Sequence, residues 1–359
     1  MHTDEDVRQL ERLRLVERVT TPVNRVALLG ALGRENSSTA WHPTRESVAQ
    51  SVAVTTPITD APLAGGSPAD EEPVRTIGAG ADVSGRVVAV WGPIGSPGVS
   101  SMTLALAGCA AQAGRSTLIV DANVYGGAQS ALLNLFDEAP GVASACRLAA
   151  RDELSRDQLA RVSETVTHGQ FRLTVLTGIP DASRWTELAP ESVRTVLARA
   201  REMWDVTFVD LSFCLEEDEE ISSDLFAPRR NGVTVSVLAE ADVVVGVTGC
   251  DSLSLSRYIL ALPRLRELVG PTPLVTCVNR LRQSAAGLAP EASVRETLQR
   301  FAGIDDALCV SDDPDLLDRA LVAGTPPTWV TQRGRYASSV RALYERASEQ
   351  WAARVEAGA

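Results

Sequence analysis

The 359-residue sequence contains no lysine, so arginine supplies all 34 of its basic side chains. Without a lysine ammonium group the chain has no Schiff-base or pyridoxal chemistry and no Tyr-Lys pair of the kind many dehydrogenases use. It also lacks the lysine that commonly holds phosphate in glycine-rich loops. Codon bias toward arginine explains most of this absence, and it predicts arginine wherever lysine is expected.

Histidine and closely spaced cysteine are also scarce. The three histidines are scattered and the six cysteines are widely spaced, which excludes a His/Cys metal cluster and a paired-thiol redox site. We expect the cysteines to be small buried hydrophobes. No basic-then-apolar leader opens the sequence, and no uncharged apolar run reaches membrane-spanning length. These absences predict a cytoplasmic protein without a direct membrane anchor.

Basic charge is in the minority. Forty-six acidic residues against 34 basic ones leave a net charge of -12, which repels phosphate backbones and anionic lipid at long range. We therefore expect no strong nucleic-acid binding. With 45% hydrophobic and 22% charged residues, the composition is typical of a soluble globular protein.

Composition divides the chain into three parts. Residues 1–34 have the pattern of a short α/β fragment that is too small to fold alone. Residues 35–84 are rich in Ser, Thr, Pro, Gly and Ala, which predicts a flexible linker. Residues 85–359 alternate short β-branched runs with helical stretches, which predicts an α/β domain with a doubly wound, mostly parallel sheet.

The pattern within the third part gives expected element bounds. Strands are expected at 86–91, 116–121, 171–177, 206–211, 243–248, 274–278 and 307–310. The clearest helices are expected at 101–113, 190–204, 252–268, 292–301, 314–323 and 336–353.

The first strand runs through a glycine-rich loop, Gly92–Met102, directly into a helix. This geometry cradles phosphates, because glycines allow close backbone approach and the helix start presents free N–H groups. A hydroxyl in the first helical turn, here Ser100 or Ser101, can hold Mg²⁺. A tight glycine turn in a nucleotide-free α/β protein remains the alternative.

Polar residues follow three other strands. Asp121 and Asp210 each end an apolar strand, where a carboxylate can reach Mg²⁺ or its waters, and Asn279 ends a third. Ligands of open α/β sheets bind at the carboxyl ends of the strands. We therefore expect these residues and the loop to meet at one crevice.

This combination and order of motifs resembles the MinD/ParA-like branch of P-loop ATPases over residues 85 to about 330. Within that branch the linker, the receiver-like segment 1–34 and Tyr125-Gly126-Gly127 resemble the CpaE/TadZ group, which positions pilus, secretion and septum components. The resemblance implies a homodimer that binds ATP or ADP with Mg²⁺. It also implies protein partners that recruit it to the pole or membrane.

The resemblance also assigns roles. The implied Mg²⁺ ligands are Ser100, Asp121 and Asp210. The implied nucleotide-binding residues are Gly95, Ser96, Pro97, Gly98, Val99, Ser100, Ser101 and Asn279, with the loop Ser311–Pro314 near the base.

Three positions of the resembling motif have become neutral. The first signature lysine falls on Ile94, the phosphate-binding (Walker A) lysine on Val99, and the acid that orients the attacking water on Asn123. Codon bias does not explain these residues, since it would have placed arginine at positions 94 and 99. No residue is therefore assigned a catalytic role.

The neutral residues are expected to affect nucleotide binding and ATP hydrolysis to different degrees. A hydrogen bond to a charged partner is worth about 1.5–3 kcal/mol, so loss of the lysine weakens nucleotide binding by about one to two powers of ten. Removing a single donor to the transition state lowers the rate by about 10²–10³. These losses predict a localisation or assembly factor with weak or lost nucleotide binding and little or no hydrolysis, a pseudo-ATPase.

Three alternatives remain open. A slow but active ATPase requires another cation at the phosphates, and Arg229-Arg230 is the candidate, although a solvent-facing helix start paired with acids also explains it. An NAD-binding oxidoreductase would use Asp121, but the glycine spacing does not fit. A DNA partitioner is opposed by the acidic surface.

Overall fold

The computed structural model describes residues 85–358 except for 96, 136–140 and 217–228. The chain divides into two units, Met1–Gly78 and Ala79–Ala359, and the described residues belong to the second. The segments predicted at 1–34 and 35–84 lie outside the described residues.

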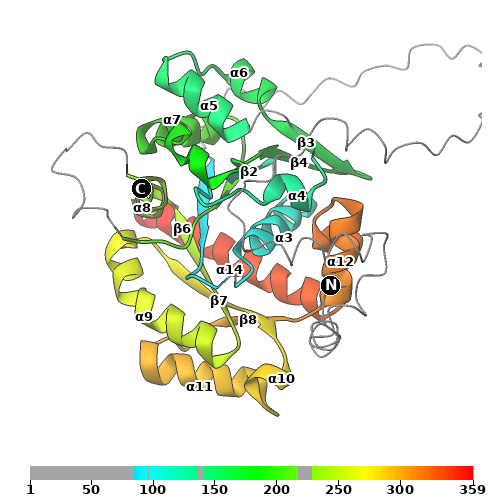
Figure 1. Cartoon of the computed structure of the whole chain (residues 1–359). Helices are drawn as coiled ribbons and strands as arrows, with labels where there is room; N and C mark the ends of the chain where they lie inside the picture. The colour runs from blue at the N-terminus through cyan, green and yellow to red at the C-terminus, as the bar shows by residue number, and fades with distance from the viewer. Residues whose placement is uncertain (1–84, 96, 136–140, 217–228, 359) are drawn as a thin grey trace, which may run out of the picture. The chain divides into compact units, whose positions relative to one another are not determined.

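An eight-stranded sheet forms the centre of the described residues (Figure 1). Its order is β3-β4-β2-β5-β1-β6-β7-β8, and every neighbouring pair is parallel except β3 with β4. The strands are β1 (Arg86–Trp91), β2 (Thr117–Asp121), β3 (Glu164–His168), β4 (Phe171–Leu176), β5 (Val206–Asp210), β6 (Val243–Gly249), β7 (Leu274–Leu281) and β8 (Leu308–Ser311). The predicted doubly wound, mostly parallel α/β fold is confirmed.

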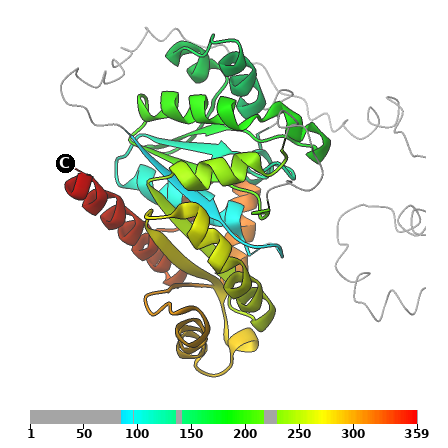
Figure 2. The same cartoon turned by 90° about the vertical axis from the view of Figure 1, so that its left-hand side faces the viewer.

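Helices cover both faces of the sheet, as the turned view shows (Figure 2). One face packs against α5 (Gly141–Ala150), α6 (Arg156–Arg161), α7 (Pro190–Arg201), α8 (Gly232–Glu240), α9 (Ser252–Val269) and α11 (Pro290–Ala302). The other packs against α3 (Val99–Gln112), α12 (Pro314–Ala323), α13 (Pro327–Val330) and α14 (Arg335–Gly358). The short elements α4 (Gln129–Leu132), η2 (Ala182–Glu187) and α10 (Gln283–Ala286) lie in connections. This layering makes the strands apolar on both faces, which is why β-branched runs predicted them.

Several elements differ from the predicted ones. The edge strand β3 was not predicted, because only Val166 of its five residues is buried and its sequence shows little apolar pattern. Helix α3 begins at Val99, two residues earlier than predicted, because Gly98 ends the loop in a left-handed conformation. Helices α5, α6 and α8 fill connections to which no helix bounds were assigned.

The cysteines follow the prediction in part. Cys109, Cys146, Cys250 and Cys277 are buried, whereas Cys214 and Cys309 are partly exposed. The last helix packs on the sheet through Val340, Leu343 and Ala347, whose helical spacing places them on one face.

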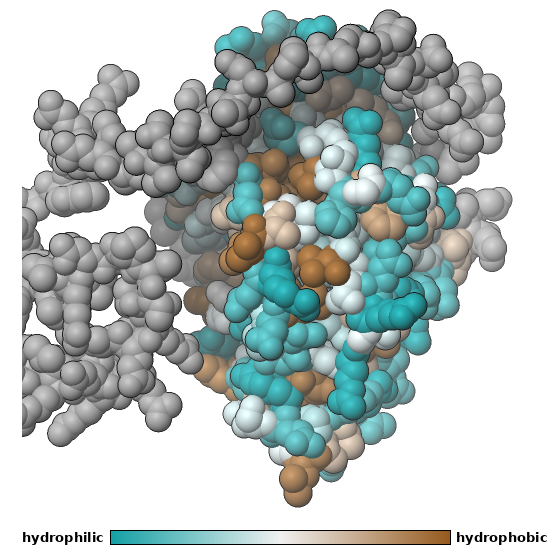
Figure 3. Space-filling model, turned by 90° about the vertical axis from the view of Figure 1, so that its right-hand side faces the viewer, coloured by the Kyte–Doolittle hydropathy of each residue, from teal (hydrophilic) through white to brown (hydrophobic). Residues whose placement is uncertain are grey.

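The face in Figure 3 is mainly hydrophilic, with small separate hydrophobic patches. Within the described part of the chain, no helix combines the length and apolar composition that a membrane crossing requires.

Candidate nucleotide site

The glycine loop leaves β1 at the middle of the sheet and turns into α3 at its carboxyl edge. A methyl group on Gly92 would lie 2.6 Å from the Val247 carbonyl oxygen, so only glycine fits beside β6. Gly98 is the N-cap of α3 with φ +93° and offers no side-chain cap. The first amides of α3 therefore have no capping side chain, as a helix start that binds an anion requires.

A cavity of about 370 Å³ opens over this loop. It brings together the predicted nucleotide-binding residues of the loop other than Ser96, which lies outside the described residues, with Asn123, two residues that follow β5 and one residue of β7. Its lining residues are Gly92, Pro93, Ile94, Gly95, Pro97, Gly98, Val99, Ser100, Ser101, Asn123, Leu211, Phe213 and Arg280. Among these, Arg280 is the only charged residue.

The three neutral positions have distinct environments. Val99 is half-buried and packs against the core beneath α3. Ile94 is 55% exposed. Asn123 accepts a hydrogen bond from the Tyr125 backbone N–H at 3.0 Å, which closes the turn after β2. Positions 99 and 123 thus line the cavity without bringing a charge to it.

Asp121 and Asp210 are register neighbours on β2 and β5, and both are completely buried. Oδ2 of Asp121 accepts backbone N–H groups from Ala128 at 2.8 Å and Gln129 at 2.9 Å. A methyl group on Gly178 would lie 2.5 Å from the Asp121 Cγ. Asp121 is thus enclosed by backbone and behaves first as a structural carboxylate.

Gln129 connects the carboxylates to the loop. Its Nε2 donates to Asp210 Oδ2 at 2.8 Å and to the Ser100 carbonyl at 3.0 Å. Among the described residues, Asp210 Oδ1 and Gln129 Oε1 are buried without a hydrogen-bond partner. An unpartnered buried carboxylate oxygen is unfavourable unless a proton or cation satisfies it.

Burial raises the pKa of both carboxyl groups. Desolvation is the main cause for Asp210, and the neighbouring Asp121 charge adds to it, while Gln129 and Ser100 oppose it. Desolvation also raises the pKa of Asp121, but backbone donors from Gln129, Asn123 and Ala128 limit the rise. With no cation present the pair therefore favours holding a proton.

Asn279 reaches the loop rather than an open cavity. Its Nδ2 donates to the Pro97 carbonyl at 2.9 Å, and its Oδ1 accepts the Arg280 backbone N–H at 2.9 Å. The side chain is 6% exposed. In this structure Asn279 holds the loop in place, whereas the resemblance implied contact with a base.

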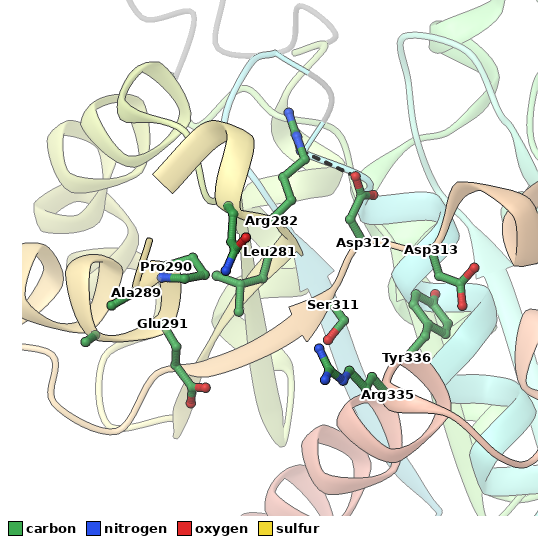
Figure 4. Close-up of a pocket in the computed structure, with 12 residues that line it drawn as sticks. Leu281, Arg282, Ala289, Pro290, Glu291, Ser311, Asp312, Asp313, Arg335 and Tyr336 are labelled. Atoms are coloured by element: carbon green, nitrogen blue, oxygen red, sulfur yellow. Dashed lines mark ion pairs between the residues drawn. The ribbon is translucent and has the colours of Figure 1, made fainter. Parts of the chain in front are cut away.

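A second cavity, of about 1000 Å³, lies on the other side of the β7 end. Of the predicted loop Ser311–Pro314, three residues line it: Ser311, which ends β8, and Asp312 and Asp313, which follow. Figure 4 shows Arg282 paired with Asp312, at 3.7 Å, and Arg335 of α14 beside Ser311. Unlike the loop cavity, this one contains charges of both signs.

The cations near the loop come from positions to which the sequence patterns assigned no role. Arg257 on α9 donates from Nη1 to the Ile94 carbonyl at 3.2 Å. The considered candidate Arg230 instead stacks on Tyr125 with its Cζ 4.0 Å from the ring centre, and it donates to two backbone carbonyls. Among the described residues, Arg230 is therefore held by an aromatic ring and two backbone carbonyls rather than by a carboxylate.

Two of the residues that shape the site were missed or left without a role. Gln129 had no sequence signal beyond its place eight residues after Asp121. Arg280 was visible in the run that ends β7, but only the strand order shows that it faces the loop.

Comparison with known proteins gives structural likeness only. No protein-family model and no curated protein sequence matches the chain. Among solved structures, a ParA family ATPase from Chlorobium tepidum is 18% identical with a TM-score of 0.59, covering 74% of this chain and 99% of its own.

Two further structures are similar. The septum site-determining protein MinD from Pyrococcus horikoshii, complexed with Mg-ADP, is 16% identical with a TM-score of 0.55, covering 73% of this chain and 95% of its own. The MinC:MinD cell division complex from Aquifex aeolicus is 14% identical with a TM-score of 0.51, covering 73% of this chain and 94% of its own. The described domain therefore has the fold of MinD/ParA-type P-loop ATPases.

Proposed function

We propose that this chain is a nucleotide-binding localisation or assembly factor of the MinD/ParA type that binds ATP or ADP and hydrolyses ATP slowly or not at all. The observation that carries the proposal is the lining of the loop cavity. It contains the glycines, the start of α3 and the hydroxyls of Ser100 and Ser101, but the side chains at positions 99 and 123 are neutral.

The loop supplies what a phosphate needs from the backbone. Gly95 and Gly98 have positive φ values, +114° and +93°, and α3 starts without a side-chain cap. These features create an anion site at a helix start without any lysine. Phosphates would lie over Gly95–Ser101, with the Ser100 hydroxyl at their inner end.

The residues beneath the loop fit Mg²⁺. The orphaned Oδ1 of Asp210 is a buried oxygen donor, and the Ser100 hydroxyl is the second donor implied at this position. Asp121 is engaged by three backbone N–H groups and would act mainly by positioning α4 and Gln129. When bound, Mg²⁺ would neutralise phosphate charge.

The base and ribose would extend past β7 toward the second cavity. Leu281, the residue after Arg280, lines that cavity together with Ser311, Asp312 and Asp313 of the predicted loop. Asn279 would support the base indirectly, because its amide already holds Pro97.

The cellular role is proposed by likeness. MinD in the Aquifex aeolicus structure is in complex with MinC, and we propose that this chain similarly works through protein partners. A homodimer, a cytoplasmic location and recruitment by pilus, secretion or division proteins of the CpaE/TadZ kind complete the proposal.

Calorimetry of the full chain with ATP and ADP in the presence of Mg²⁺ tests binding, and phosphate release tests hydrolysis. The Ser100→Ala/Asp210→Asn variant is the control for site-specific signal. We expect binding in the wild type, weakened in the variant, with phosphate release indistinguishable between the two. Absence of binding would overturn the proposal, and turnover clearly above the variant would identify a working ATPase.

A further inference from the structure

The described lining of the loop cavity contains one charged side chain. Arg280 is the only charged residue among those that line it, in a chain that carries 46 acidic and 34 basic residues. Within the described part of the chain, no carboxylate lies within ion-pair distance of its guanidinium, and no hydrogen bond from that group is found. An unpaired guanidinium beside a cavity without acids creates a local preference for an anion.

The guanidinium lies next to the turn that begins α3. A methyl group placed on Gly98 would be 3.9 Å from Nη2 of Arg280. On the other side of the loop, Arg257 holds the Ile94 carbonyl. The segment where a phosphate-binding loop normally carries its own lysine is thus flanked by arginines from β7 and α9.

The backbone at Arg280 is unusual and well held. Its backbone φ is +57°, in the left-handed region that residues other than Gly, Asn and Asp rarely adopt. Its N–H donates to Asn279 Oδ1, and its carbonyl oxygen accepts from Cys250 Sγ at 3.0 Å. Such conformations persist where the surroundings fix them, and they cluster at functional sites.

We propose that the Arg280 guanidinium is the phosphate-binding cation of this site and replaces the lysine that is absent at Val99. The inference rests on the proposed nucleotide binding and names the residue responsible for it. A guanidinium can engage two phosphate oxygens at once, which suits it to this role. Arg257 acts as a positioning residue through the Ile94 carbonyl.

The charge at the site thus has a different origin from that of a loop lysine. A lysine at position 99 would rise from the first turn of α3, whereas Arg280 approaches from the end of β7, two strands away from β1. Arg280 restores attraction for phosphate but supplies no acid at Asn123 to orient water. Binding is therefore recovered without hydrolysis.

Calorimetry on the full chain with ATP, ADP and adenosine, each with Mg²⁺, tests this role. Arg280→Asn removes the charge but tolerates the left-handed backbone, and Arg280→Gly is a second uncharged variant with the same tolerance. Arg280→Lys keeps a charge. Arg300→Asn, an exposed position on α11, is the matched control.

We expect both uncharged variants to bind ATP and ADP about 10–100-fold more weakly than the wild type, with adenosine binding unchanged. Arg280→Lys should lose less, and Arg300→Asn nothing. Wild-type ATP affinity in a folded uncharged variant would overturn the role of Arg280 and leave the proposed function standing. An equal loss for adenosine and ATP would also overturn it, because that result indicates structural damage. Failure of the wild type to bind any of the three overturns the proposed function as well.

Discussion

Two regions of the site differ in charge: the glycine loop, and the layer beneath it formed by Asp121, Asp210 and Gln129, which we call the floor. On the loop side, the positions expected to be charged are neutral, and the one charged residue among the described residues that line the cavity, Arg280, comes from β7. On the floor, Asp121 and Asp210 remain side by side, completely buried and linked to the loop by Gln129. The two carboxylates thus lie beneath a loop whose own described side chains carry no positive charge.

The difference shows what each region contributes. Asp121 accepts hydrogen bonds that fix α4 and the turn after β2. Asp210 accepts one from Gln129, which also donates to the Ser100 carbonyl at the start of α3, so removal of these carboxylates damages the fold. Of the loop-side positions, only Ile94 is exposed and supports little structure, whereas Val99 packs partly on the core and Asn123 closes the turn after β2. Val99 and Asn123 thus support the core and this turn with neutral side chains, whereas loss of Asp121 would leave the backbone N–H groups of Ala128 and Gln129 without their acceptor.

Returning charge to the loop should have the largest effect. We expect Val99→Lys/Asn123→Asp to raise ATP turnover by about 10²–10³, because a transition-state donor and a water-orienting acid are both restored. Phosphate release under saturating ATP measures it. Val322→Lys, at an 84% exposed position on α12, is the charge control. Unchanged turnover in a folded double variant would mean that the deficit lies elsewhere.

Cutting the link between floor and loop should cost stability. Gln129→Leu removes the side-chain amide that donates to Asp210 Oδ2 and to the Ser100 carbonyl, so both oxygens lose this hydrogen bond. We expect unfolding free energy to fall by about 2–4 kcal/mol, measured by urea denaturation. Gln299→Leu, exposed on α11, should change it by less than about 0.5 kcal/mol. Equal effects would show that Gln129 does not link floor and loop.

The free energy of unfolding should decrease with rising pH because Asp210 is buried in the floor. Burial raises the pKa of Asp210, so the folded chain holds this proton more tightly than the unfolded chain. The resulting stabilisation is complete below about pH 4, the ordinary aspartate pKa, and is lost as the pH rises through the raised value. Holding the proton tenfold more tightly in the folded chain is worth about 1.4 kcal/mol.

Asp210→Asn should flatten this dependence in urea midpoints measured between about pH 5 and pH 8. Asp318→Asn, exposed on α12, should leave the wild-type slope intact. A variant slope as steep as that of the wild type would assign the titration to another group.

The smallest effect should come from Arg230. Its contact with the Tyr125 ring and its two carbonyl partners predict a loss of about 0.5–1 kcal/mol in unfolding free energy for Arg230→Ala. ATP affinity should not change, in contrast to Arg280→Asn. A drop in ATP affinity at Arg230 with none at Arg280 would reverse the assignment of the phosphate cation.

Sequence patterns predicted the elements that are buried on two faces and missed those that are not. The β-branched runs of β1, β5 and β6 gave their positions within a residue or so, because full burial requires apolar side chains throughout. Strand β3 has one buried residue and was missed. In the same way, the glycine loop and the strand-end aspartates were visible, but the contact between Gln129 and Asp210 was not, since an isolated polar residue has no periodic pattern.

The sequence by itself determined the alternating α/β fold, the loop at the first strand end, and the neutral residues at positions 94, 99 and 123. Only the tertiary structure decided that Arg257 contacts a residue 163 positions earlier in the chain and that Arg280 faces the same loop. The physical reason is the order of the sheet. Strand order brings β7 within two strands of β1, and this distance in space is independent of their separation along the chain.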